Sequence, residues 1–138
     1  MLQFYFFSVL FNAITGLVLV FSDKLSSGSP VQEGLLVIVQ NRTFRFVLGL
    51  LTMITGFLKL VTVVRGDVPV IGDIFPACAG LVGGFILVYE YYKSRPETTD
   101  EKPLPNFAQK IISWKQYVGY VMLAAAVLHL LFPQVLFI

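Results

Sequence analysis

Hydrophobic residues fill four long runs of this chain, and the charged residues lie almost entirely between the runs. The four helices expected from them cover about residues 2–22, 46–64, 68–92 and 116–132. A helix needs roughly 20 apolar residues to cross the hydrocarbon core of a bilayer, and three of the runs come close to that length. None of the runs has the polar face that a helix in water requires. The pattern therefore predicts a protein whose main solvent is lipid.

The connections between the runs indicate how the helices are joined. Residues 65–67 form a tight link, which makes the second and third helices an antiparallel hairpin. We therefore predict an all-α polytopic membrane protein. Its four transmembrane helices are expected to form one compact antiparallel bundle over residues 1–138.

Two shorter apolar segments lie between the runs. A helix is expected over residues 107–115, where Phe107, Ile111 and Trp114 share one face. This pattern is typical of a helix lying on the inner leaflet, and the alternative is an overlong fourth helix. Residues 35–39 are too short to cross a bilayer, and we favour an interfacial position for them.

Composition agrees with a lipid environment. The chain is 57% hydrophobic and 13% charged, whereas globular domains carry roughly 25% charged residues. The single cysteine, Cys78, cannot form an internal disulfide, and we expect it to be a buried, inert thiol. No spacing of Cys and His indicates a metal or haem site, so we expect neither a metal nor a cofactor.

Basic residues are distributed unevenly between the two sides of the predicted bundle. Eight of them lie in or beside the first and third connections: Lys24, Arg42, Arg45, Lys93, Arg95, Lys102, Lys110 and Lys115. The second connection holds Arg65 alone. By the positive-inside rule, residues 23–42 and 93–115 are predicted to be cytoplasmic, and both termini are predicted to lie outside.

Small residues recur at helical spacing along each predicted span. In the second and third spans they include Gly49, Gly56, Gly80 and Gly84. Small side chains let helices approach closely in lipid, where the hydrophobic effect does not drive helices together. We predict that these glycines pack helices within the bundle, and the pattern leaves open whether some of them face a second copy.

Ionisable and polar side chains within the spans are the candidate functional positions. A charge at the centre of a membrane helix costs roughly 2.5–3.5 kcal/mol on insertion scales. Lys59, Asp73 and His129 lie near the outer ends of their helices, and Asn12 lies near the middle of the first span. These four residues are the candidate lining of a polar pocket near the outer leaflet. The alternative is structural, with each side chain reaching headgroups or a backbone partner.

A different charged group is expected at the inner face. Glu90 lies at the inner end of the third span, at about the level of Arg45 and Lys115. Charges at helix ends commonly reach water or one another. We therefore predict a structural ion pair that involves these three residues.

The second span also carries a recognisable pattern. Arg45, Gly49, Gly56 and Lys59 follow the spacing Arg-x3-Gly-x6-Gly-x2-Lys, and the third span contains Gly80-Leu-Val-Gly-Gly84. This arrangement resembles the DoxX-like family of small four-helix bacterial membrane proteins. The resemblance implies a bundle in a bacterial inner membrane. Some members of that family are linked to quinone-dependent sulfur oxidation or to oxidative-stress complexes.

Two functions remain open from the sequence. The first is an auxiliary subunit or partner-binding module of a membrane complex, with a membrane protein or a second copy as the partner. The alternative is a lipid- or quinone-type amphiphile-binding or transport protein that uses the polar pocket. No nucleophile–base pair, phosphate loop or CxxC motif is present, which disfavours an enzyme. The basic residues follow the predicted topology, so we expect no nucleic-acid partner.

Overall fold

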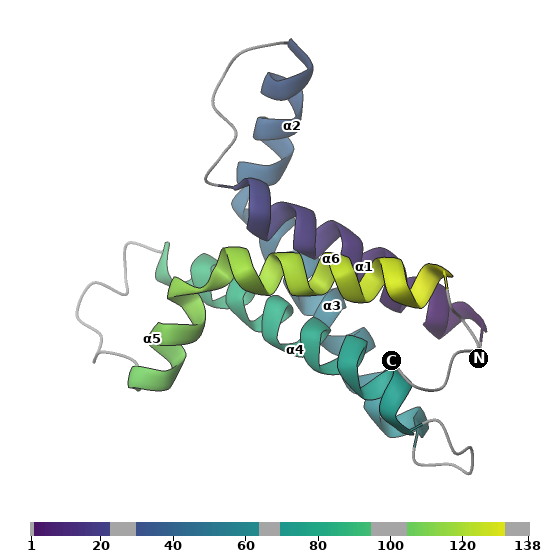
Figure 1. Ribbon diagram of the computed structural model, residues 1–138. Helices are drawn as coiled ribbons and strands as arrows, with labels where there is room; N and C mark the ends of the chain where they lie inside the picture. The colour runs from purple at the N-terminus through teal and green to yellow at the C-terminus, as the bar shows by residue number, and fades with distance from the viewer. Residues whose placement is uncertain (1, 23–29, 64–69, 95–104, 132–138) are drawn as a thin grey trace.

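A computed structural model describes residues 2–22, 30–63, 70–94 and 105–131 (Figure 1). All regular structure within these ranges is α-helical, so the expectation of an all-α protein is confirmed. The helices are α1 (Leu2–Phe21), α2 (Pro30–Gln40), α3 (Arg42–Val63), α4 (Val70–Lys93), α5 (Asn106–Ser113) and α6 (Lys115–Leu131).

Two helix starts differ from the expected ones for local reasons. Helix α3 begins at Arg42, about one turn before the expected start, because the side chain of Asn41 caps it. The backbone N–H of Phe44 donates to Asn41 Oδ1 at 3.1 Å, which satisfies one N–H at the end of the helix. Helix α5 begins at Asn106 with Pro105 at its N-cap, and no side chain caps it there.

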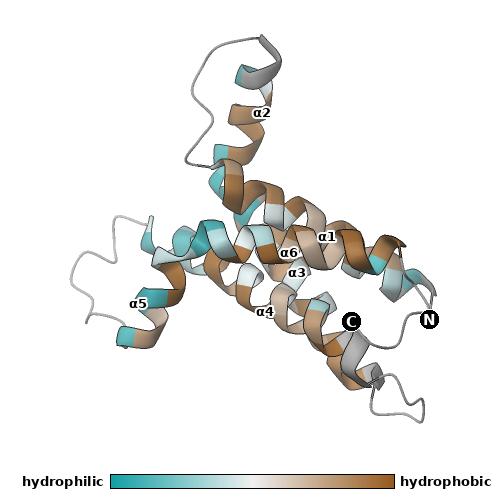
Figure 2. Cartoon of the chain, viewed as in Figure 1, coloured by the Kyte–Doolittle hydropathy of each residue, from teal (hydrophilic) through white to brown (hydrophobic). Residues whose placement is uncertain are grey.

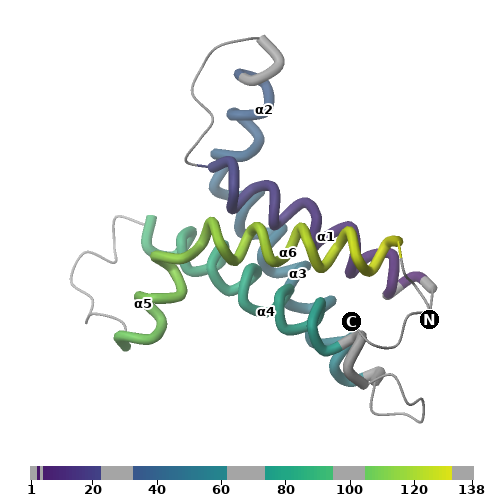
Figure 3. The backbone as a smooth tube through the Cα atoms, in the orientation of Figure 1, coloured from purple at the N-terminus to yellow at the C-terminus, as the bar shows by residue number. Residues whose placement is uncertain are grey.

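Helices α1, α3, α4 and α6 lie alongside one another and form the body of the molecule (Figure 3). The most extensive packing joins α3 to α4 and α1 to α6. The start of α1 and the end of α6 lie at the same end of the bundle, where the rings of Tyr5 and His129 are 4.5 Å apart. At the opposite end, α2 and α5 project sideways in opposite directions (Figure 1).

Glycines allow the close approach within both helix pairs. A Cβ atom placed on Gly84 in α4 would lie 2.6 Å from the carbonyl oxygen of Gly49 in α3. A Cβ atom on Gly16 in α1 would lie 2.9 Å from the carbonyl oxygen of Gly119 in α6. Any larger side chain would push the backbones apart, so each pair depends on small residues. These glycines contact neighbouring helices of the same chain.

The outside of the bundle is apolar, while polar residues gather towards its two ends (Figure 2). Large hydrophobic side chains such as Leu50, Ile54 and Phe57 are exposed along α3. An apolar surface of this extent indicates a lipid or protein partner, because water would not favour it. The largest fully buried side chains among the described residues are those of Leu19, Ile86, Leu87, Met122, Thr15 and Thr52.

Two helical segments are long and apolar enough to cross a membrane, Arg42–Val61 in α3 and Ile74–Lys93 in α4. A third qualifies only if α5 and α6 count as one span, although they meet at an angle of 66°. The apolar part of α1, Tyr5–Phe21, is shorter. Within the described residues, two or three segments are thus candidate spans by length and composition, and the bundle of four spans stays a prediction.

Candidate functional site

A lysine and a histidine from different helices meet at the end of the bundle where α1 begins. The Nζ atom of Lys59 in α3 lies 2.8 Å from Nε2 of His129 in α6. Lys59 is only 5% exposed. The two nitrogens form a hydrogen bond in which the tautomer of His129 sets the donor and the acceptor. The structure thus brings together two of the four residues predicted to line the polar pocket.

Tyr5 of α1 completes this cluster, which the sequence did not indicate. Its hydroxyl donates to the backbone carbonyl of His129, and its ring lies 5.4 Å from Lys59 Nζ. A cation over an aromatic face is attracted by the quadrupole of the ring, more strongly where water is excluded. A tyrosine in an apolar run carries no sequence signal that separates this role from simple packing. We refer to Lys59, His129 and Tyr5 as the lysine cluster.

Of the other two predicted pocket residues, only Asn12 has a described side chain. Asp73 lies in the first turn of α4, and its side chain is outside the described part of the structure. Asn12 is buried deeper in the bundle, where Nδ2 donates to the carbonyl of Pro76 at 3.1 Å. In the described ranges, Asn12 Oδ1 is buried and has no hydrogen-bond partner. The four-residue pocket therefore remains a prediction.

Threonines continue the buried polar positions towards the middle of the bundle. The hydroxyls of Thr15 in α1 and Thr52 in α3 lie 2.8 Å apart. Thr52 donates its single proton to the carbonyl of Leu48 at 2.7 Å, so Thr15 is the donor between the two. Hydrogen bonds of this kind join membrane helices where apolar packing alone gives little preference for one register.

At the opposite end of the bundle, Glu90 of α4 lies between two basic side chains. Arg45 of α3 forms a hydrogen-bonded ion pair with Glu90 Oε2. Lys115 of α6 lies 3.2 Å from Glu90 Oε1. The carboxylate thereby joins three helices, and each of these side chains is about four-fifths shielded from solvent.

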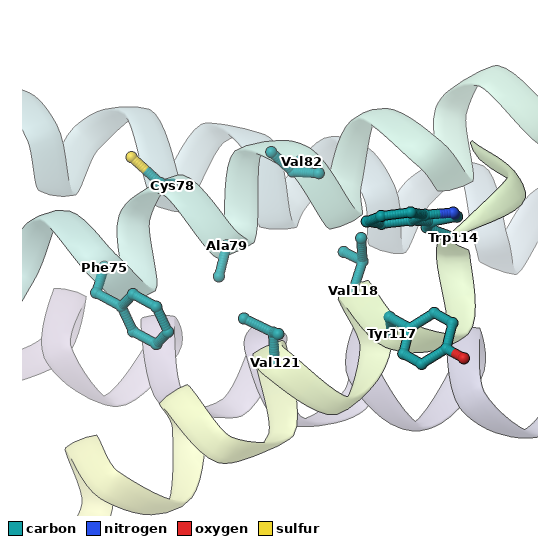
Figure 4. A pocket seen from close by; sticks show the side chains of 8 residues that line it. All are labelled: Phe75, Cys78, Ala79, Val82, Trp114, Tyr117, Val118 and Val121. Carbon is teal, nitrogen blue, oxygen red and sulfur yellow. The ribbon is translucent and has the colours of Figure 1, made fainter. Parts of the chain in front are cut away.

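An apolar groove runs between α4 and α6 (Figure 4). Its volume is about 730 Å³. The lining residues repeat the same spacing on both sides: Phe75, Cys78, Ala79 and Val82 on α4, and Trp114 between α5 and α6 followed by Tyr117, Val118 and Val121 on α6. Trp114 and Tyr117 lie at one end of the groove and Phe75 lies towards the other.

The groove lies next to a close glycine contact between α4 and α6, where a Cβ atom on Gly83 would lie 2.1 Å from Sδ of Met122. The glycine contacts described above join α3 to α4 and α1 to α6, whereas the lining between α4 and α6 consists of alanine, valine, cysteine and aromatic side chains. The sequence did not predict this groove. The only signal for it was the matching spacing on the two helices, which is also the spacing of an ordinary lipid-facing stripe.

Cys78 is exposed at the groove, so the expectation of a buried thiol was wrong. Apolar residues on every side of a membrane helix hide which side faces the interior. In α4 the neighbouring residues Ala77 and Ala79 are buried and Cys78 is turned away from both.

Comparison with known proteins identifies relatives but no activity. A family model matches residues 1–129. An uncharacterised protein of Treponema pallidum (strain Nichols) is 32% identical over 138 residues, which covers the whole of both chains. No solved structure matches significantly.

These matches overturn the resemblance to the DoxX-like family, for which no match was found. The four residues of the Arg-x3-Gly-x6-Gly-x2-Lys pattern have local roles instead. Arg45 pairs with Glu90, and Lys59 contacts His129. The two glycines pack on α4, Gly49 on Gly84 and Gly56 on Ala77. Short patterns of glycine and basic residues recur in membrane helices because close packing and helix ends demand them.

Proposed function

Because the chain belongs to a family of uncharacterised Treponema proteins, we propose its function from its own geometry, as a membrane protein that holds an amphiphile. The hydrocarbon chain of that amphiphile occupies the groove between α4 and α6. The observation that carries the proposal is the groove itself, because it is apolar along its length and has polar aromatic side chains at one end.

The proposal includes the arrangement of the chain in the bilayer. Helices α1, α3, α4 and α6 each cross the membrane, and both termini lie outside. Helices α2 and α5 then lie at the cytoplasmic interface, where both project sideways from the bundle. The supporting features are the apolar sides of the bundle and the basic residues gathered beside the first and third connections.

The shape of the groove suits a single hydrocarbon chain. Its lining covers two turns of each helix, or about 10 Å at 1.5 Å per residue. A chain lying there gains dispersion contacts with apolar atoms on both sides, which neighbouring lipid provides less completely. The groove has too few small residues on its walls for the close backbone approach of another transmembrane helix.

The end of the groove near α5 suits the polar part of the same molecule. Tryptophan and tyrosine concentrate at the level of lipid headgroups, and Trp114 and Tyr117 occupy this end. Lys110 Nζ lies 5.3 Å from the Trp114 ring and adds a positive charge. An amphiphile with an anionic headgroup, such as a fatty acid, matches both features.

Trp114 provides a direct test because it is the only tryptophan of the chain. The purified protein in a neutral detergent would be titrated with stearic acid that carries a nitroxide quencher on its hydrocarbon chain. We expect saturable quenching of Trp114 fluorescence, reversed by unlabelled stearic acid. Val121→Phe fills the groove and should weaken the binding about tenfold or more, which corresponds to a loss of about 1.4 kcal/mol or more in binding free energy.

The matched control is Val47→Phe, which makes the same enlargement on the outer side of α3, where Val47 is exposed. This variant should bind the probe as the parent protein does. Quenching that rises linearly with the probe, or that is equal in both variants, would contradict the proposal.

A second candidate function is supported by α2. Leu35, Val37 and Ile38 are all at least half exposed, and α2 projects away from the bundle. These side chains suit contact with a partner protein as an auxiliary subunit would make it. Affinity purification from native membranes should then recover a defined partner that is lost in Val37→Ser. Recovery of the same proteins by both forms would exclude this role for α2.

A further inference from the structure

A polar cavity lies at the end of the bundle from which α2 and α5 project. Its volume is about 310 Å³. Residues from the ends of α1, α2, α3 and α4 line it: Ser22, Gln40, Arg42, Arg45, Glu90, Tyr91 and Ser94. Unlike the groove between α4 and α6, this cavity is surrounded mainly by hydrogen-bonding groups.

Among the described residues that line this cavity, positive charge exceeds negative charge. The only carboxylate among its lining residues is that of Glu90, which already contacts both Arg45 and Lys115. Arg42 donates from Nη1 to the backbone carbonyl of Ser94 at 3.2 Å, which is a neutral acceptor. The cavity therefore favours an anion.

One donor at the cavity lacks an acceptor. Nε of Arg45 is buried and makes no hydrogen bond within the described ranges. Leaving a buried N–H of a charged group unpaired costs more than leaving a neutral one unpaired. An oxygen atom of a bound anion would satisfy this donor.

Size and position narrow the identity of that anion. Guanidinium groups present several N–H donors in a planar fork, which matches the oxygens of phosphate. The volume is at the small end of ligand pockets and suits one headgroup. Basic cavities between helices at the cytoplasmic surface commonly bind phospholipid headgroups.

We propose that the cavity binds a phosphate group, held by Arg42 and Arg45. The phosphate is either the headgroup of an anionic phospholipid or free inorganic phosphate. Glu90 opposes it, because its carboxylate competes for Arg45. This site is separate from the groove, so the phosphate site and the amphiphile site can be tested independently, and the failure of one leaves the other unaffected.

Calorimetric titration of the delipidated full-length protein in a neutral detergent tests the proposal. Inorganic phosphate and a short-chain phosphatidic acid would be titrated in parallel. Saturable binding of both identifies free phosphate as a sufficient ligand, whereas binding of the phosphatidic acid alone identifies a lipid headgroup. The absence of saturable binding by either ligand would overturn the proposal.

Two variants distinguish binding at this site from general charge attraction. Arg42→Gln should lower the affinity about tenfold or more, because hydrogen bonds to charged groups are among the stronger ones. Lys93→Gln removes the same charge from an exposed position near this end and outside the lining, so it should change the affinity less than threefold. Equal losses in these two variants would contradict the site.

Glu90→Gln provides a change in the opposite direction. It removes the competing carboxylate and frees Arg45, so phosphate should bind more tightly than to the parent protein. A residue that only maintains the fold would weaken binding when replaced. Weaker binding by Glu90→Gln, in a protein whose melting temperature is retained, would therefore overturn the role given to Arg45.

Discussion

Lys59 Nζ lies 2.8 Å from His129 Nε2, although 70 positions separate the two residues in the chain. Lys59 belongs to the pair α3 and α4, while His129 belongs to the pair α1 and α6. The contact therefore joins the two closely packed helix pairs at one end of the bundle. Such a polar contact favours one alignment of the two helix pairs more strongly than apolar packing does, because a buried polar group that loses its hydrogen-bond partner is costly.

The first prediction concerns this contact. His129→Leu removes the ring nitrogen that contacts Lys59 and should lower the free energy of unfolding by about 1–3 kcal/mol. In a double-mutant cycle with Lys59→Met, the two losses should be non-additive, with a coupling of about 0.5–3 kcal/mol. Denaturation of the protein in detergent, followed by circular dichroism, measures all four forms. Strict additivity would show that the residues do not stabilise one another.

The second prediction concerns the approach of α3 and α4. Gly84→Ala would place a Cβ atom 2.6 Å from the backbone oxygen of Gly49, and overpacking of this kind costs about 1–3 kcal/mol. Gly34→Ala in α2 is the control, since nothing lies within 4 Å of the added atom. Thermal unfolding should show a lower melting temperature for Gly84→Ala alone. Equal melting temperatures would contradict the close contact.

The third prediction concerns the hydrogen bond between Thr15 and Thr52. Because Thr15 is the donor, Thr15→Val removes the hydrogen bond that the Thr52 hydroxyl oxygen accepts. Thr52 keeps the hydrogen bond that it donates to the carbonyl of Leu48. Interhelical hydrogen bonds in membranes average about 0.6 kcal/mol in double-mutant cycles, so a coupling of that size is expected. The cycle with Thr52→Val measures it, and a coupling above about 2 kcal/mol would require a larger polar network.

The fourth prediction concerns orientation in the membrane. In a Cys78→Ala background, Gln3→Cys lies at the start of α1 and Ser113→Cys lies at the end of α5. A membrane-impermeant maleimide added to intact cells should label Gln3→Cys and should label Ser113→Cys only after lysis. The opposite result would reverse the assignment that the basic residues predict.

Particular residues show how far the sequence alone could lead. Glu90, Arg45 and Lys115 lie at helix ends, so their common depth followed from counting residues. Lys59 and His129 were placed at similar depth by the same counting, and their side chains do meet. Asn12 was assigned to the same pocket, but its amide donates to Pro76 of α4. Depth along a helix can be counted, whereas the direction in which a side chain points cannot.

The groove between α4 and α6 and the polar cavity at the opposite end from Lys59 were not predictable for a related reason. Both depend on how neighbouring helices are rotated and how far they separate, as the exposed Cys78 illustrates. In a helix that is apolar on all sides, the hydrophobic pattern does not distinguish the face in the interior from the face in lipid.

By itself, the sequence determined that the protein is helical, that its helices are apolar and that its charges lie at their ends. These properties depend on composition and on spacing along one helix. Only the tertiary structure decided which glycines meet, that Lys59 lies against His129 and Tyr5, and that α4 and α6 leave a groove between them. Those features arise between helices, where packing distance and rotation follow from all the side chains at the contact together.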